Sequence, residues 1–162
     1  MVGVSPALFG VTLAAAVGSL VVGGIFYGFS AITMPGLERL PEAHGVAAMQ
    51  QINVAAPRAP LLLVMGGAAL ACAVLIAWAI ATWSEPHAKW LVVGAVLYLA
   101  GAIVVTGTQN VPLNDALESV DPASATAATE WAHYLDKWTM WNHVRGAASV
   151  AAGAAFVVAL TV

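Results

Sequence analysis

Aromatic and polar residues at helical spacing lead into the last apolar stretch of this sequence. Trp131, Tyr134, Trp138, Asn142 and Arg145 follow one another at intervals of three or four, so on a helix they form one stripe. The stripe presents aromatic faces first, then an amide, then a guanidinium. A flat aromatic ligand with a carbonyl or phenol oxygen could stack on the rings while Arg145 holds the oxyanion.

The same stripe has a simpler interpretation, an interfacial aromatic belt with a snorkelling arginine. Asn53, Asn110 and Asn114 fall at the same predicted membrane level and favour a site. A permanent cation inside a membrane is costly unless it finds a partner, which makes Arg145 a functional candidate. Glu38 is the carboxylate nearest to the apolar stretches. It is expected either to pair with Arg145 or to remain a helix-end charge at the interface.

Three histidines, His44, His133 and His143, belong to the same side of the predicted protein. Each could act as a general base, because imidazole titrates near pH 6.5, about the right range for proton abstraction. His143 directly follows Asn142 and so points about 100° away from it on a regular helix. Together with Glu38 these histidines could bind a metal, yet no His-x-x-x-His spacing occurs. We therefore expect no bound metal.

The composition is that of a membrane protein. The chain of 162 residues is 61% hydrophobic and 8% charged, whereas a soluble domain contains about 25% charged residues. The net charge of −3 argues against a nucleic-acid partner. A single cysteine excludes a thiol oxidoreductase that uses paired cysteines. No P-loop, G-x-G-x-x-G or G-x-S-x-G motif occurs, so nucleotide binding and serine hydrolysis have no support.

Long uncharged stretches predict an all-α fold, a four-helix transmembrane bundle with two longer connections on one membrane face. A span needs about 20 residues, and the predicted helices lie at residues 8–30, 60–82, 90–108 and 141–162. The first is expected to be retained rather than cleaved as a signal peptide, which leaves one domain, 1–162. Pro112 predicts that the third helix ends within Asn110–Asn114. Pro41 predicts the start of a short interfacial helix in the first connection.

The distribution of cations predicts the orientation in the membrane. The two long connections contain Arg39, Arg58, Lys137 and Arg145, whereas the short connection contains Lys89 alone. The positive-inside rule then places both termini outside, in a protein that we expect to be integral to a bacterial cell membrane. No acidic residue lies inside a predicted span, which disfavours a proton-coupled transporter. Homo-oligomerisation is left open.

Four short motifs resemble the anthrone oxygenase-like family of small four-span membrane proteins. They are Asn110-x-Pro112-x-Asn114, Trp138-x-x-Trp141-Asn142-x-x-Arg145, Met34-Pro-Gly-Leu and Met49-x-x-Ile-Asn53. The resemblance covers essentially the whole chain. The resemblance implies oxidation of a polyketide anthrone to a quinone by O2, without a dedicated organic cofactor. It also implies functional roles for the matching residues Asn110, Asn114, Asn142 and Arg145.

We therefore expect a membrane-embedded oxygenase whose partners are a small apolar aromatic substrate, O2 and the lipid bilayer. The expected catalytic residues are Arg145, Asn142, His143, Asn114 and Asn110. The expected substrate-binding residues are Trp138, Tyr134, Trp141 and Asn53. His143 or His133 would remove the acidic proton. The alternative is a non-catalytic membrane protein that binds a lipid or quinone or supports a partner protein.

Overall fold

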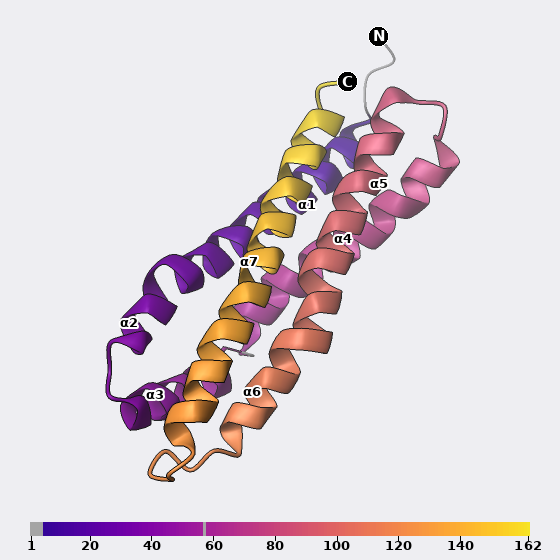
Figure 1. Cartoon of the computed structure of the whole chain (residues 1–162). Helices are drawn as coiled ribbons and strands as arrows, with labels where there is room; N and C mark the ends of the chain where they lie inside the picture. Colours follow the sequence, from indigo (N-terminus) through magenta and orange to yellow (C-terminus); the bar gives the residue numbers. More distant parts are fainter. Residues whose placement is uncertain (1–4, 57) are drawn as a thin grey trace.

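Four long helices lie side by side in the computed structural model, which describes residues 5–56 and 58–162 (Figure 1). They are α1 (Pro6–Gly28), α4 (Ala59–Ala81), α5 (Pro86–Tyr98) and α7 (Ala127–Ala159). Both α7 and α4 pack against α1 and α5, which closes a four-helix arrangement around one apolar core. No strand occurs in the described residues. The predicted all-α bundle is confirmed.

Length and composition identify an integral membrane protein. Three helical runs are long and apolar enough to cross a bilayer, Pro6–Glu38, Pro60–Ala81 and Pro86–Glu118. Large apolar side chains such as Leu63 and Leu70 are exposed on their outer faces, which suits contact with lipid. The fourth helix, α7, is 33 residues long. It is less apolar than the other three because polar residues lie in its middle, so its full crossing of the membrane stays a prediction.

The first connection is mostly helical. α1 continues through a π-helical turn, η1 (Phe29–Thr33), into α2 (Met34–Glu38), and α3 (Glu42–Ala55) then turns back across the end of the bundle. Pro41 precedes α3, so the predicted start of an interfacial helix is confirmed. The Gln50 amide nitrogen of α3 donates to the carbonyls of Leu117 (3.0 Å) and Val120 (2.9 Å). These bonds fasten α3 to the end of the third helical run.

The prediction that the third helix ends at Asn110–Asn114 is wrong. After α5 the helix continues through two π-helical segments, η2 (Leu99–Val104) and η3 (Thr106–Asn110), into α6 (Val111–Glu118). The wide turn of η3 changes the hydrogen-bond register, so Pro112 falls in a new first turn. Proline's missing N–H costs no hydrogen bond there, because the N–H groups of a first turn have no partner within the helix. Thr106, Asn110 and Asn114 consequently stay on one continuous helix, four residues apart.

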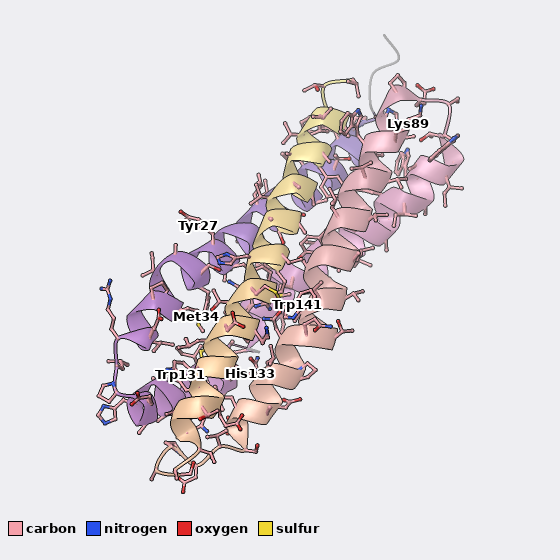
Figure 2. The ribbon with its side chains drawn as sticks, in the orientation of Figure 1. Tyr27, Met34, Lys89, Trp131, His133 and Trp141 are labelled. Atoms are coloured by element: carbon pink, nitrogen blue, oxygen red, sulfur yellow. The ribbon has the colours of Figure 1, made fainter. Side chains whose placement is uncertain are left out.

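Both long connections gather at one end of the bundle and form what we call the helical cap, which comprises α2, α3, α6 and the first half of α7. The start of α1, the end of α7 and the α4–α5 turn lie at the opposite end (Figure 1). Trp131 belongs to the cap, whereas Lys89 lies at the other end (Figure 2). A second apolar cluster holds the cap together, formed by Met34, Leu37, Val46, Met49, Leu117, Trp131, Tyr134 and Trp138.

Candidate functional site

The predicted stripe on the last helix exists, and it faces the inside of the protein. Trp131, Tyr134, Trp138, Asn142 and Arg145 are all buried on one face of α7. Because α7 is uninterrupted from Ala127 onward, helical spacing alone aligns them. The ring centroids of Trp131 and Tyr134 lie 5.7 Å apart, and those of Tyr134 and Trp138 lie 6.0 Å apart, in stacked arrangements. The rings of Trp131, Tyr134 and Trp138 stack on one another and form what we call the aromatic wall.

Arg145 is buried, 5% exposed, and is stabilised by dipoles and aromatic rings. Its Nη2 donates to Asn142 Oδ1 at 2.7 Å, and its Nη1 donates to Thr106 Oγ1 at 3.2 Å. The guanidinium carbon lies 4.2 Å from the Phe26 ring centroid and 5.1 Å from the Trp138 ring, within cation–π range. Buried cations usually require such compensation.

The proposed pair between Glu38 and Arg145 does not form. No carboxylate lies within ion-pair distance of Arg145 in the part of the chain that the structure describes. Glu38 is exposed at the end of α2. It is therefore a charge at a helix end, which is the alternative that the sequence left open.

Asn142 ties the last helix to the first. Its Nδ2 donates to the Phe26 carbonyl and to Ser30 Oγ, both at 2.7 Å, while its Oδ1 accepts from Arg145. The three bonds determine which way the amide faces. Asn142 thus orients the guanidinium and joins α7 to the point where α1 becomes π-helical.

Asn114 connects the third helical run to the aromatic wall by hydrogen bonds. Its Oδ1 accepts from Tyr134 Oη at 2.9 Å and from Trp138 Nε1 at 2.8 Å. Tyr134 precedes the apolar half of α7, and burial raises the pKa of its phenol above the ordinary value, so the hydroxyl stays a donor. Because Oδ1 faces these two donors, the amino group of Asn114 points away from the aromatic wall. Asn110 is buried next to this pair, and its Nδ2 donates to the Trp138 carbonyl at 3.2 Å.

An apolar hollow of about 750 Å³ opens beside these groups, and we call it the amide pocket. Its polar lining includes Asn53, Thr106 and Asn114. Its apolar lining is formed by Leu61, Leu62, Met65, Ala69, Ile103 and Val111. The combination of apolar walls and a few converging polar groups is typical of a small-molecule site. Its volume lies within the range of about 300–1,000 Å³ that such sites occupy.

Asn53 brings an unused donor to the amide pocket. Asn53 lies beside the Tyr134 phenol. Its buried Nδ2 lies close enough to the Tyr134 hydroxyl to favour the ionised phenol, but it makes no hydrogen bond of good geometry with any described residue. A buried amide without a partner is costly, so such a group often marks where a ligand or water binds.

The structure places Arg145 behind the amide pocket. Thr106 lies between the guanidinium and the pocket, because it accepts from Arg145 and also lines the pocket wall. The residues that line the described hollows do not include Arg145. Its positive charge therefore lies on the far side of Thr106 from the pocket, in a buried region where charges interact more strongly than in water.

Of the predicted site residues, only Asn53 and Asn114 line the amide pocket. Tyr134 and Trp138, which we expected to stack on a ligand, do not line it, and neither do Asn110 and Asn142. Three further predicted residues lie elsewhere on α7. His143 is exposed and lines two other hollows, one of them between α1 and α7. His133, predicted as an alternative base, is also exposed on α7 (Figure 2). Trp141 is half-buried on α7 (Figure 2). The described residues include no group of three or more His, Cys, Asp or Glu side chains able to hold a metal.

The sequence reasoning missed Thr106, Phe26 and Ser30, all of which contact the Arg145–Asn142 pair. Thr106 precedes Asn110 by four residues, as Asn110 precedes Asn114. That spacing would have indicated Thr106 as a site residue if the predicted helix had continued past Pro112. Ser30 follows Phe26 by four residues in an otherwise apolar run. The cation–π contact of Phe26 has no counterpart in the sequence pattern.

Comparison with known proteins places this site in a family context. The sequence model of the anthrone oxygenase family matches residues 59–155, which include α4 and almost all of α7. No curated protein and no solved structure matches the chain. The matched region contains the residues Asn110, Asn114, Asn142 and Arg145. Because the match extends over more than half of the sequence, the chain belongs to the anthrone oxygenase family.

Proposed function

We propose that this protein is a membrane oxygenase that uses O2 to convert a flat phenolic polyketide of the anthrone type into the corresponding quinone. The observation that carries the proposal is the amide pocket, whose apolar walls meet the polar groups of Asn53, Thr106 and Asn114. Membership of the anthrone oxygenase family supports the reaction class. An anthrone is flat, apolar and soluble in lipid, so it would enter this pocket from the membrane.

The amides would stabilise the substrate after it loses a proton. The central CH2 of an anthrone is acidic because the carbanion delocalises into the carbonyl across the ring. Asn53 Nδ2 is a free donor, and the amino group of Asn114 is turned away from the aromatic wall. Both would donate to the enolate oxygen, as hydrogen-bond donors do in an oxyanion hole. Arg145, behind Thr106, would add a positive potential in a region of low dielectric constant.

The reaction balances without a further reductant. Removal of one proton gives the enolate, which transfers an electron to O2, and the two radicals combine into a peroxide anion. Protonation gives a hydroperoxide on the former CH2 carbon. Loss of the remaining hydrogen of that carbon, with cleavage of the O–O bond, releases one water and leaves the quinone carbonyl. One O2 is consumed for each quinone formed.

The first test is a direct assay of purified protein in lipid nanodiscs with emodin anthrone under air. Quinone absorbance and O2 consumption are measured together, and the rate in empty nanodiscs is subtracted because anthrones oxidise slowly in air. We expect a one-to-one ratio of O2 to quinone. A rate equal to that of empty nanodiscs would leave a non-catalytic lipid- or quinone-binding protein as the better description.

Asn114→Asp separates the oxyanion role from the structural role of Asn114. The carboxylate still accepts from Tyr134 and Trp138, so we expect the fold to persist. It no longer donates to the enolate, so turnover should fall by about 10²–10³-fold, as for loss of one oxyanion donor. Thr108→Ala is the matched control, since Thr108 is exposed on the same helix. Wild-type turnover in Asn114→Asp would remove Asn114 from the proposed site.

A further inference from the structure

The amide pocket also contains two carboxylates. Asp115 and Glu118, both on α6, line it in addition to its amides and apolar walls. No other charged residue lines this pocket within the described residues. The amides supply donors for an enolate oxygen, but the proton of the CH2 needs an acceptor, and a carboxylate is one of the groups that serve as general base in enzymes.

We propose that Asp115 is the general base that removes the proton from the substrate, an inference that rests on the proposed function of the pocket. Asp115 directly follows Asn114 on α6, and successive side chains on a helix diverge by about 100°. In an anthrone the CH2 lies across the central ring from the carbonyl. Asn53, Asn114 and Asp115 all line the pocket. The two amides would hold the carbonyl end of the ring, and Asp115 would face the CH2 end.

The other titratable groups of this region are less suitable. His143 and His133 line other hollows. The Tyr134 hydroxyl already donates to Asn114. Glu118 lies one helical turn beyond Asn114, nearer the end of α6. Asp115 is therefore the acceptor closest in the chain to the amide that would hold the enolate oxygen.

A carboxylate is a sufficient base when the enolate is stabilised. In enzymes that form enolates, an aspartate of nearly ordinary pKa removes the proton because hydrogen-bond donors hold the developing oxyanion. Asp115 would take one proton from the CH2 and leave the electron pair in the enolate. It would return that proton to the peroxide anion after O2 has added. It would then take the second hydrogen of the same carbon as a proton while the O–O bond breaks and hydroxide leaves, and this proton converts the hydroxide to water.

Hydrogen exchange without oxygen tests this step by itself. The protein in nanodiscs is mixed with emodin anthrone in D2O under nitrogen, and deuterium entering the CH2 is followed by mass spectrometry. We expect the wild type to accelerate exchange above empty nanodiscs. Asp115→Asn should lower this acceleration by about 10²–10⁴-fold, the usual contribution of a general base. The same variant should lower kcat for quinone formation and leave KM nearly unchanged, because the pocket keeps its shape.

Two further variants make the result specific. Asp121→Asn is the same chemical change in the α6–α7 turn, and Asn keeps the oxygen that accepts from the Ala123 N–H, so exchange should match the wild type. Glu118→Gln should reduce exchange far less than Asp115→Asn. Wild-type exchange in Asp115→Asn, or a larger loss in Glu118→Gln, would overturn the assignment of Asp115.

The outcomes also separate this inference from the proposed function. Quinone formation by a wild-type protein that does not accelerate exchange would overturn the base and leave the oxygenase intact. Failure of both exchange and oxidation would overturn the oxygenase itself. Exchange that depends on Asp115, together with quinone formation, supports both.

Discussion

Arg145 is a buried cation without an anionic partner among the described residues. Its compensation comes from the Thr106 hydroxyl, the Asn142 amide and two aromatic rings. Hydrogen bonds to a charged group contribute about 1.5–3 kcal/mol, and a desolvated cation–π contact about 2 kcal/mol. A neutral shell of this kind keeps the positive charge uncancelled, so the charge remains available to act on the neighbouring pocket.

Replacement of Arg145 should reveal this dependence on dipoles and rings. Arg145→Ala should lower the free energy of unfolding by about 3 kcal/mol, because Asn142 loses its donor and both ring contacts disappear. Arg145→Lys should lower the free energy of unfolding by less than Arg145→Ala does. A single ammonium cannot bond to both Thr106 and Asn142 and also stack on two rings as the planar guanidinium does. Thermal unfolding in detergent measures both. Arg39→Ala is the control at an exposed arginine, with an expected change within about 0.5 kcal/mol. Equal unfolding temperatures for all variants would contradict this account.

At the scale of elements, the position of α3 decides whether Asn53 reaches the amide pocket. α3 packs against α7 through Gly45, where an added Cβ would lie 2.8 Å from Trp131 Cε2. Trp131 is itself stacked on Tyr134 and so has little freedom to move away. Close approach at Gly45, together with the bonds from Gln50 to the end of α6, therefore holds α3 over the pocket.

A methyl group at Gly45 should displace α3. Gly45→Ala should cost about 1–3 kcal/mol through overpacking, and turnover should fall more than stability does because Asn53 moves with α3. Tryptophan fluorescence and the anthrone assay measure the two effects. Gly36→Ala is the matched control at the same end of the bundle, because an added Cβ there meets nothing within 4 Å. Unchanged fluorescence and turnover in Gly45→Ala would show that α3 accommodates the methyl group.

At the scale of the whole molecule, the site is one-sided. The helical cap and its polar groups lie at one end of the bundle, and the start of α1 and the end of α7 lie at the other (Figure 1). Arg145 is buried in the site and so does not count as a topology signal. Arg39, Arg58 and Lys137 at the cap end still outnumber Lys89 at the other end.

The positive-inside rule therefore continues to predict a cytoplasmic cap with both termini outside. A phosphatase reporter that is active only outside the cytoplasm should be active when fused after Val162 or after Glu85, in the α4–α5 turn. The same reporter inserted after Ser124, between α6 and α7, should be inactive. A fluorescent protein fused after Val162 that fluoresces brightly would reverse the predicted orientation.

The sequence by itself determined the class of the protein, its long helices and one face of α7. Apolar stretches of membrane length and residues spaced by three or four depend only on local periodicity, so the stripe from Trp131 to Arg145 was predicted correctly. The family resemblance also followed from short motifs, and the match over residues 59–155 confirms the family. The matched region contains the motifs around Asn114 and Asn142, whereas the motifs at Met34 and Met49 lie before it.

Only the tertiary structure decided which groups meet. Pro112 indicated a helix end, but the π-helical turn η3 carries the helix onward to α6. This continuation brings Thr106, Asn110 and Asn114 to α7, and packing of α3 adds Asn53. Hydrogen-bond register within a helix and the approach of distant helices depend on long-range packing rather than on local periodicity. For that reason the sequence predicted that Arg145 faces the ligand, whereas in the structure Thr106 lies between Arg145 and the pocket.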